Sequence, residues 1–449
     1  MLTDSPSHYA AVREATSRAQ RLGRPVLASW TAPSSLEPIS FFARAANAAD
    51  RALWMRPTSG DALVGIGAAS TLTGHGANRF RHIREQWREL LAEAVSDDPP
   101  EQAFGGPLLL GGFSFDPTRR RSSDLWTGFP DARLVLPDRM LVVREGRAWL
   151  THNVVVRPHA ASQQHTQPPT PAANGVDPTL SAEQWQTLVG SIGRGIRTGQ
   201  LGVQKVVLAR AEQIQQARPI DSQLVVRNLA ESYPACTVFA VARGDACFVG
   251  ATPERLIALR DGTASTLALA GSFPRGATPD EDQRAAERLL QDPKERAEHA
   301  IVVAAVREAL AQVCTRVISD TQPRLKQLSN VQHLLTPIRA AVAAGVGILD
   351  LVERLHPTPA VGGFPTHRAL ELIREREALD RGWYAGPIGW MNRAGEGEFV
   401  VGIRSALLNG SSATLFAGCG IVGESDPARE YAESGWKLQP MRAALGLKT

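Results

Sequence analysis

Cysteine is scarce in this sequence, which has only four in 449 residues and no C-x-x-C pair. That density excludes a fold held together by disulfides. No apolar run reaches the roughly 18 residues that a bilayer-crossing helix needs. The first residues, MLTDSPSHYA, lack the basic and apolar regions of a secretory signal. We therefore expect a soluble, cytoplasmic protein that makes no contact with a membrane.

Long runs of one charge sign are missing too. The 49 Lys and Arg residues against 45 Asp and Glu leave a net charge of +4, and the only basic run that stands out is Arg119–Arg121. This balance excludes a protein built around phosphate neutralisation, so we expect no nucleic-acid partner. The P-loop, GxSxG and HExxH motifs are also absent. The 43% of hydrophobic residues indicates a globular chain.

One segment has the composition of a linker. From Arg157 to Val176 the chain has no acidic residue and consists largely of Pro, Gln, Ala and Thr. Such a stretch cannot bury enough apolar surface to form a core, so we predict a linker or exposed loop at 157–177. It would separate an N-terminal part, residues 1–156, from a C-terminal part, residues 178–449.

Hydrophobic spacing predicts a mixture of strands and helices. In the N-terminal part we expect a helix at about 78–95. Strands are expected at 107–115, 132–136, 140–143, 203–211, 236–243, 247–259, 265–271, 383–391, 397–408 and 412–419. Only short turns separate the last three, which predicts an antiparallel meander.

Two helices in the C-terminal part are predicted to begin alike, at Asp292-Pro293 and at Asp426-Pro427. In each, an aspartate caps the helix and a proline occupies its first position. The second helix should end or kink at Pro440, which lacks a backbone donor. Each helix also carries a Glu-x-x-Glu pair, namely Glu295 and Glu298 in the first and Glu430 and Glu433 in the second.

These glutamate pairs have two interpretations. Taken singly, each pair is best explained as a solvated surface. The first pair would favour the helix dipole, and the second would form a salt-bridge ladder with Lys437. Two such helices in one chain favour the other interpretation, in which four carboxylates converge on one hard cation. Mg²⁺ is the usual cation of this kind beside an anionic substrate.

Lys205 and Glu254 are the candidates for acid–base chemistry. Lys205 lies within the apolar strand VQKVVLARA, and Glu254 follows a proline in FVGATPERL. A lysine on a strand is most often an edge or solvent residue, and Glu254 could simply pair with Arg255. If it is buried, however, a lysine is less stable as a cation, which suits a general base.

The segment GCGIVG, Gly418–Gly423, matches the G-x-G-x-x-G pattern of dinucleotide-binding enzymes. Only 26 residues follow it, too few for the rest of a βαβ unit. The strands before it are also predicted to form a meander. A nucleotide-binding oxidoreductase is therefore a disfavoured alternative, and these glycines instead allow a ligand to approach backbone amides.

A series of segments resembles the chorismate-utilising enzymes, the family of anthranilate synthase component I, aminodeoxychorismate synthase component I, salicylate synthase and isochorismate synthase. Two upstream segments, GGFSFDP (111–117) and FPDARLVLP (129–137), resemble the N-terminal region of isochorismate synthases. The main series covers about 200–440 and consists of KVVLAR (205–210), FVGATPERL (248–256), LAGSFPRG (269–276), DPKERAEH (292–299), VQHL (331–334), LHPTPAVGGFP (355–365), GWYAGPIGW (382–390), VGIRSA (401–406), AGCGIVGESDP (417–427) and EYAESGWK (430–437).

This resemblance implies an α+β fold like that of anthranilate synthase component I, with two large antiparallel β-sheets packed face to face and helices outside. Chorismate would lie in a deep cleft. In isochorismate synthases a lysine activates water to attack C2 of the ring, and a glutamic acid protonates the departing C4 hydroxyl. Lys205 and Glu254 match these two positions.

The resemblance also implies a metal site and substrate contacts. Mg²⁺ would be held directly by Glu298 and Glu433, and through water by Glu295 and Glu430. Arg404 and Tyr384 match the groups that bind the enolpyruvyl carboxylate, a task that suits a guanidinium fork. The remaining matched positions are His333 near the ring and, lining the carboxylate sites, Gly271, Ser272, Gly418, Gly420 and Lys437.

Single positions distinguish the members of the family. Ala270 stands where aminodeoxychorismate synthases with a nucleophilic lysine carry that lysine. Ala360, in PTPAVGG, stands where anthranilate and salicylate synthases usually carry threonine, and it is typical of isochorismate synthases. Ser272-Phe273 departs from the more common Thr-Arg. The resemblance thus implies an isochorismate synthase that needs no glutaminase subunit.

Several alternatives stay open. A salicylate synthase would need a further pyruvate-elimination step, and a siderophore-pathway isochorismate synthase would share the same chemistry. Menaquinone biosynthesis is the pathway that we expect. A chorismate-binding relic without activity is disfavoured because the chain retains both Lys205 and Glu254.

Overall fold

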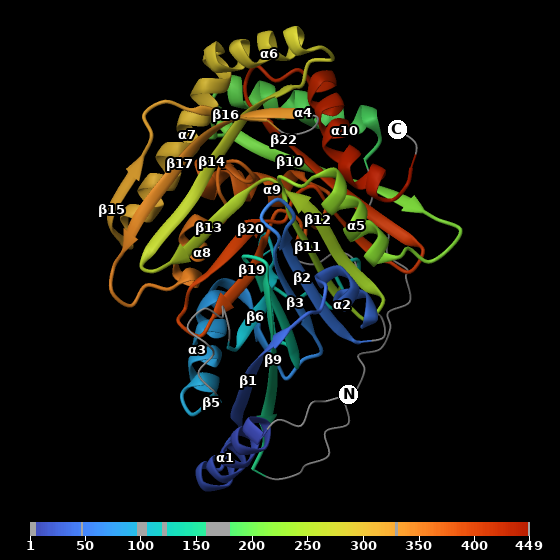
Figure 1. Cartoon of the computed structure of the whole chain (residues 1–449). Coiled ribbons are helices and arrows are strands. Elements are labelled where there is room, and N and C mark those ends of the chain that lie inside the picture. The colour runs from blue at the N-terminus through green and yellow to red at the C-terminus, as the bar shows by residue number, and fades with distance from the viewer. Residues whose placement is uncertain are drawn as a thin grey trace.

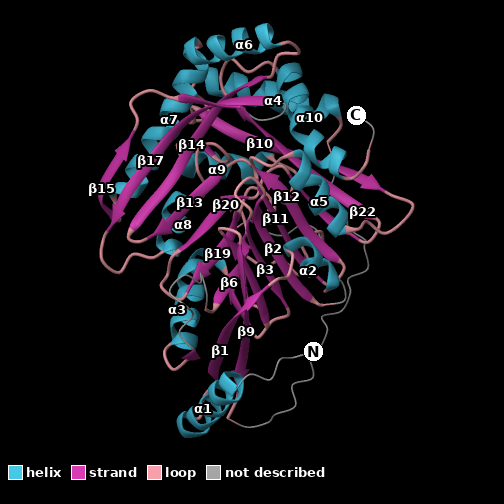
Figure 2. Ribbon diagram, in the orientation of Figure 1, coloured by secondary structure: helices cyan, strands magenta, loops and turns pink. Residues whose placement is uncertain are grey.

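The computed structural model describes residues 6–45, 48–96, 106–118, 124–158, 180–327 and 331–447. Within these ranges the chain forms two large β-sheets with helices around them (Figures 1 and 2). The larger sheet has twelve strands, in the spatial order β18 (Gly363–Phe364), β10 (Lys205–Gln215), β22 (Ser412–Ile421), β21 (Ser405–Asn409), β12 (Ala246–Thr252), β11 (Thr237–Arg243), β2 (Asp50–Arg56), β3 (Asp61–Ile66), β8 (Arg139–Arg144), β9 (Arg147–Val156), β1 (Val26–Ser34) and β5 (Val95–Ser96).

The smaller sheet has ten strands in the same described ranges, and strand β16 (Arg324–Gln327) pairs with β17 beside the main path. In both sheets neighbouring strands are antiparallel, except that β1 and β5 of the larger sheet are parallel. The main path is β15 (Cys314–Ser319), β17 (Val331–Val342), β14 (Thr263–Pro274), β13 (Arg255–Arg260), β20 (Gly397–Val401), β19 (Pro387–Asn392), β6 (Leu108–Phe113), β7 (Ala132–Leu136) and β4 (Ser70–Gly74).

Helices cover the outer faces of both sheets (Figure 1). Helices α3, α7 and α8 pack on the smaller sheet, while α2, α5 and α10 pack on the larger one. The helices are α1 (Pro6–Leu22), α2 (Pro38–Arg44), α3 (Arg79–Leu91), α4 (Ala182–Arg197), α5 (Ser222–Ser232), α6 (Pro279–Gln291), α7 (Pro293–Ala311), α8 (Ile348–Leu355), α9 (Thr366–Arg376) and α10 (Pro427–Ala444). None of the described helices is both long and apolar enough to cross a membrane.

The main core lies between the two sheets. Phe113 and Phe399 of the smaller sheet and Phe248 and Phe416 of the larger one belong to one buried cluster. Trp126 packs on the larger sheet, with ring centroids 5.3 Å from Phe248 and 5.5 Å from Phe416. Burying an aromatic or aliphatic side chain of this size contributes about 1.5–3 kcal/mol. The predicted α+β fold with two sheets packed face to face is confirmed.

Two of the predicted strands are wrong, because each one is two strands in different sheets. The segment 247–259 splits at Pro253 into β12 in the larger sheet and β13 in the smaller sheet. The segment 397–408 splits into β20 and β21, which likewise lie in different sheets. Arg404, at the second break, has a φ of 51° in the left-handed region. Both halves of each segment are apolar, so the sequence pattern did not reveal the change of sheet.

The predicted meander is therefore wrong as well. The chain makes one hairpin, β19–β20, in the smaller sheet, crosses over, and makes a second hairpin, β21–β22, in the larger sheet. Short turns do indicate antiparallel pairing between neighbours. They do not show that all the strands stay in one sheet.

Pro440 does not end its helix, since α10 runs on to Ala444, and the kink stays a prediction. The proline leaves the carbonyl of Trp436 without its helical donor, and Trp436 is half exposed, so water can reach that carbonyl. Beyond the proline, the buried side chains of Met441 and Ala444 pack on the larger sheet. Their burial offsets the lost hydrogen bond.

Other features of the structure agree with the predictions from the sequence. The helix predicted at about 78–95 is confirmed as α3, and Asp292 and Asp426 cap α7 and α10 through their side chains. Almost all of the predicted linker at 157–177 lies outside the described residues. Strands from before and after it pair directly, as β2 does with β11 and β6 with β19.

Candidate active site

All fifteen residues that the sequence pointed to line one cleft. The cleft holds about 1000 Å³ of free space, including solvent at its mouth. These residues are Lys205, Glu254, Gly271, Ser272, Glu295, Glu298, His333, Ala360, Tyr384, Arg404, Gly418, Gly420, Glu430, Glu433 and Lys437.

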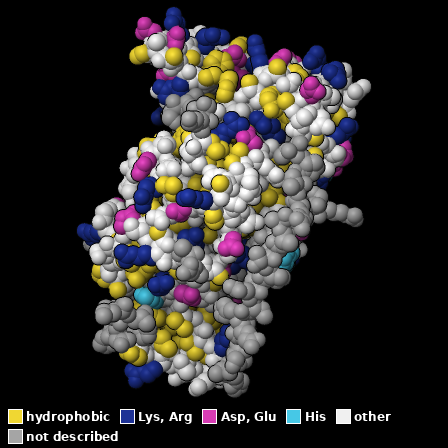
Figure 3. Space-filling view, turned by 90° about the vertical axis from the view of Figure 1, so that its right-hand side faces the viewer, with side chains coloured by type: hydrophobic (Ala, Val, Ile, Leu, Met, Phe, Trp, Pro, Cys, Tyr) yellow, Lys and Arg dark blue, Asp and Glu magenta, His cyan; other side chains and the backbone are white. Residues whose placement is uncertain are grey.

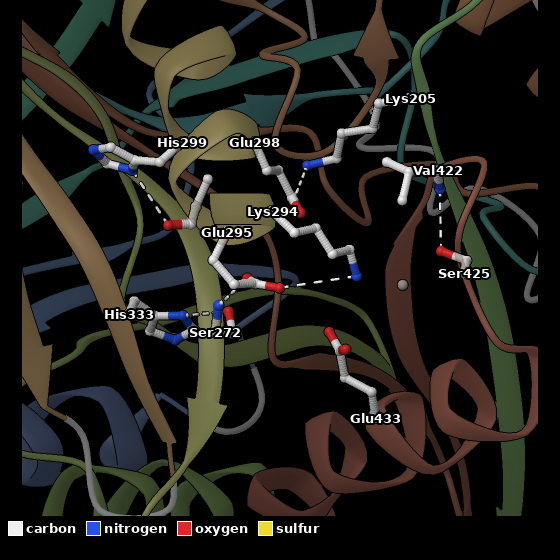
Figure 4. Close-up of polar contacts among 12 residues, drawn as sticks. Lys205, Ser272, Lys294, Glu295, Glu298, His299, His333, Val422, Ser425 and Glu433 are labelled. Atoms are coloured by element: carbon white, nitrogen blue, oxygen red, sulfur yellow. Dashed lines mark hydrogen bonds and ion pairs between the residues drawn. The ribbon is translucent and has the colours of Figure 1, made fainter. Parts of the chain in front are cut away.

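Lys205 is the first residue of β10 and is buried, with 3% of its surface exposed. It is therefore neither an edge nor a solvent residue. Its ammonium group forms an ion pair with Glu298 of α7 (Figure 4). A Cβ atom at Gly420, on the neighbouring strand β22, would lie only 2.6 Å from Cε of Lys205. A larger residue at 420 would therefore force the lysine side chain to shift from this position.

Glu254 and Arg404 lie at the two points where the chain crosses between the sheets. The amide of Val401 donates to the carbonyl of Glu254 at 3.0 Å, and the amide of Ala251 donates to that of Arg404 at 3.2 Å. The two crossings therefore hold each other in place. Burial raises the pKa of Glu254 to about 7, even though Lys205 and other nearby cations act against it. A carboxyl group with this pKa can donate a proton near neutral pH.

Helix α7 brings Glu295 and Glu298 into the cleft from the smaller sheet (Figure 4). Burial opposes ionisation of Glu298, but the cations Lys205 and Lys294 outweigh it and lower its pKa. Burial and then the like charge of Glu298 raise the pKa of Glu295. The Glu295 carboxylate accepts a hydrogen bond from the amide of Ser272 at 3.0 Å.

Helix α10 brings Glu430 and Glu433 to the same cleft from the larger sheet. Burial and the neighbouring charge of Glu433 raise the pKa of Glu430 to about 7. Glu430 also accepts a hydrogen bond from Ser425 Oγ at 2.8 Å. Burial opposes ionisation of Glu433, but Lys437, at 2.6 Å, lowers its pKa. The ion pair of the simpler interpretation does form, but it is partly buried and lines the cleft.

The donor set of the cleft fits a hard cation. In the described part of the chain, one group of potential ligand atoms lies within 4.8 Å of one another, and it comprises Cys419, Glu430 and Glu433. Burial raises the pKa of the Cys419 thiol, which donates to the backbone carbonyl of Glu430 at 3.2 Å. The thiol thus stays protonated, and the remaining donors are carboxylate oxygens, which suit Mg²⁺. Glu295 and Glu298 lie outside that group, so convergence of all four carboxylates stays a prediction.

A bulge in β14 places the polar wall of the cleft. The pairing of β14 with β17 shifts register between Ala270 and Ser272, and Gly271 between them has a φ of 77°. Beyond the bulge, Ser272 lies opposite His333, and Ser272 Oγ and His333 Nδ1 share a hydrogen bond of 2.6 Å (Figure 4). Burial and the cations Arg404 and Lys437 lower the pKa of His333 to about 3, so the imidazole is neutral.

The remaining predicted residues shape the opposite wall. Tyr384 is buried against Phe416, with ring centroids 5.2 Å apart, and burial raises its pKa to about 12. A Cβ atom at Gly418 would lie 3.1 Å from the Tyr384 hydroxyl, so a larger residue there would crowd the phenol. Lys437 Nζ donates to the Gly418 carbonyl at 2.9 Å.

Sequence reasoning missed three charged residues. Lys294 lines the cleft and lies 3.9 Å from Glu295, and its place beside Glu295 in DPKERAEH could have marked it. Arg381 also lines the cleft and forms a buried pair with Glu377 at 2.7 Å. Arg381 donates to the carbonyls of Val207 and Val361, and so ties two walls together. The spacing of four residues between Glu377 and Arg381 was the available signal.

Comparison with known proteins identifies the class. Residues 12–446 match the family described as "Chorismate binding enzyme". The chain therefore belongs to the chorismate-binding enzyme family.

Individual proteins show which members of the family the chain resembles. The salicylate biosynthesis isochorismate synthase of Pseudomonas aeruginosa is 41% identical over 455 residues, covering 96% of this chain and 92% of that protein. The isochorismate synthase MenF of Bacillus subtilis is 37% identical over 462 residues and covers 97% of each chain. The structure of the menaquinone-specific isochorismate synthase MenF from Escherichia coli matches with a TM-score of 0.76 at 25% identity, over 97% of this chain and all of that one.

Proposed function

We propose that this enzyme is an isochorismate synthase, which converts chorismate to isochorismate. Water adds at C2 of the ring and the C4 hydroxyl leaves as water, so the reaction is an isomerisation with no net change in atoms. The observation that carries the proposal is the pair Lys205 and Glu254, both buried and both lining one cleft. The relatives named isochorismate synthases support it.

The two residues have complementary roles. Lys205, in its uncharged form, would take a proton from the attacking water. Glu254, whose pKa is about 7 because of burial, would donate a proton to the departing hydroxyl. A positioned acid and a positioned base each contribute about 10²–10⁴-fold to a rate.

The charges of the cleft suit a dicarboxylate substrate. Arg404 is partly buried, and its guanidinium donates to no protein acceptor within the described ranges, so it is available for a carboxylate. Lys437, Lys294 and the neutral His333 line the same space. Because the pKa values of Glu254 and Glu430 are about 7, these two glutamates are only partly ionised at neutral pH, which lessens the negative charge that an anionic substrate meets in the cleft. We assign the enolpyruvyl carboxylate to Arg404 and Tyr384.

We further propose that the enzyme depends on Mg²⁺. The carboxylates of Glu298 and Glu433 would hold it, supported by Glu295 and Glu430. When bound, Mg²⁺ would supply positive charge for the ring carboxylate of the substrate. The crowding of like charges that raises the pKa of Glu295 and Glu430 is what a divalent cation relieves.

Product analysis of the full-length protein with chorismate and Mg²⁺ tests the proposal. Isochorismate should form without added ammonia, glutamine or a second subunit, and no NAD should bind. Salicylate or anthranilate as the main product would refute it. Menaquinone as the purpose stays a prediction, because the relatives include proteins named for salicylate and for menaquinone.

Two variants test the assigned roles. Lys205→Ala and Glu254→Gln should each abolish turnover while circular dichroism and thermal unfolding stay close to those of the unaltered protein. Glu308→Gln makes the same change as Glu254→Gln at an exposed position of α7 and should be fully active. Substantial turnover by either site variant would contradict the mechanism.

A further inference from the structure

A second cavity lies behind Glu254, on the far side of its neighbour Pro253. It holds about 630 Å³ of free space, counted as for the cleft with the solvent at its mouth, and Pro253 is the one residue that it shares with the cleft among the described residues. We infer that this cavity is a separate binding site for a small organic anion. Its charged lining consists of Arg56 from β2, Arg255 from β13 and Lys326 from β16.

The cavity has more positive than negative charge. Arg56 and Arg255 share a single carboxylate, Glu398, which is 4% exposed and lies 3.0 Å from Arg255 Nε. Lys326 forms no ion pair with any carboxylate in the described part of the chain. Its ammonium group donates to the carbonyl of Pro253 at 2.9 Å. Two further carboxyl groups lie nearby: Asp61, which pairs with Arg56 across the β2–β3 hairpin and acts on its charge, and Glu254, which faces the cleft on the other side of Pro253.

A partly buried ammonium without a counter-ion is costly. Burial lowers the pKa of Lys326, and the neighbouring Arg255 acts in the same direction. An anion in the cavity would remove this cost by pairing with Lys326 and the free edges of the two guanidinium groups. The chain rarely uses lysine, with only five among its 49 basic residues. Three of those lysines line the cleft, and Lys326 lines this cavity.

The size and the walls of the cavity define the class of ligand. Its volume far exceeds the space of one water molecule or one inorganic ion. The lining has a polar part, which includes Thr58 and Thr252, and an apolar part, which includes Leu267 and Pro234. A small carboxylate with an apolar ring or chain satisfies both parts. Its bond to Lys326 would compete with the one that holds Pro253, the residue that precedes the proposed acid Glu254.

Benzoate titrated into the full-length protein by isothermal calorimetry is the direct probe. We expect a saturable binding step that depends on Lys326, beside the benzoate that the cationic cleft takes up, and no such step with benzamide, which has the same shape without the charge. Lys326→Met should weaken benzoate binding at least about tenfold, since a hydrogen bond to a charged group contributes about 1.5–3 kcal/mol. Lys326→Arg keeps the charge and should retain binding.

Two matched control variants show whether the benzoate site is this cavity rather than the cleft or the protein surface. Lys437→Met makes the same change in the cleft and should leave the binding step that depends on Lys326 unaltered. Arg324→Met removes an exposed cation from the same strand, β16, and should also have no effect. Failure to bind benzoate, equal binding of benzamide, or a loss of affinity in Lys437→Met but not in Lys326→Met would overturn the inference. These outcomes do not depend on whether chorismate is the substrate.

Discussion

Helices α7 and α10 begin with the same local sequence but belong to different surroundings. Each starts with a capping aspartate and a proline, and each carries a Glu-x-x-Glu pair. Helix α7 packs on the smaller sheet and α10 on the larger one, so their N-terminal turns approach the cleft from opposite sides (Figure 1). The shared motif therefore determines which side chains each helix carries. The sheet on which each helix packs determines from which side those side chains reach the cleft.

The partners of the two pairs differ accordingly. Glu298 of α7 pairs with Lys205, which comes from strand β10 far earlier in the chain. Glu433 of α10 pairs with Lys437, one turn later in its own helix. A pair within one helix is readable from spacing. A pair between a helix and a strand depends on the fold, so the two helices serve the cleft differently.

The largest expected difference concerns the second glutamate of each pair. Glu298→Gln removes both a proposed metal ligand and the counter-ion of Lys205, so kcat/KM should fall by about 10²–10⁴-fold. Glu433→Gln leaves Lys437 bound to the Gly418 carbonyl and should cost less. Steady-state kinetics at saturating Mg²⁺ measures both, with Glu308→Gln as the control. Equal losses would mean that the two helices contribute alike.

The first glutamate of each pair should have a smaller effect. Glu295→Gln and Glu430→Gln should each weaken the apparent Mg²⁺ affinity by about 10–100-fold, the usual cost of losing a supporting group. Because the pKa of Glu430 is about 7, its carboxyl is mostly neutral at pH 6. The effect of Glu430→Gln should therefore be small at pH 6 and full at pH 8. An effect that does not change with pH would refute this role.

The pH profile should show two limbs with different origins. Glu254 must be protonated to act as an acid, so kcat/KM should decline above its pKa of about 7, approaching tenfold per pH unit. Glu430 must be ionised to support the metal, so Mg²⁺ affinity should rise over the same range. Raising the Mg²⁺ concentration should shift the acidic limb and leave the alkaline limb in place. A shift of both limbs would contradict the assignment.

The smallest expected effect concerns the two capping aspartates. Asp292→Ala and Asp426→Ala should each lower the free energy of unfolding by about 1 kcal/mol, because each removes the side-chain acceptor of one helix. Asp292 is also the C-cap residue that follows α6, so its replacement should cost slightly more. Denaturant unfolding at constant m-value measures both. A larger loss of unfolding free energy for Asp426→Ala than for Asp292→Ala would contradict this prediction.

The distribution of charge on the surface and in the cleft differs, and the overall composition does not show this difference. On the face in Figure 3, basic and acidic side chains are interspersed, as the small net charge of +4 suggests. Inside the cleft, by contrast, charges are concentrated: Lys205, Arg404 and Lys437 lie among five glutamates. The net charge of the chain does not reveal such local clustering, because the fold determines where each charged side chain lies.

Much of the fold and nearly all of the candidate site could be read from the sequence. Helix caps, hairpin turns and the extent of β11 depend on neighbouring residues, so local patterns were sufficient. The assignment of Lys205 and Glu254 came from ordered motifs. The pair of Arg381 with Glu377 was missed, since nothing in its spacing shows that both residues are fully buried.

The sequence by itself determined the chemical groups of this protein: a lysine in an apolar strand, an acid after Pro253, and two capped helices that carry glutamates. Only the tertiary structure decided that β12 passes into β13, and β20 into β21, by changing sheet. These crossings place Glu254 and Arg404 in the cleft, and burial there gives Glu254 its raised pKa. The physical reason is that local sequence sets backbone conformation, whereas burial and charge pairing depend on residues distant in the chain.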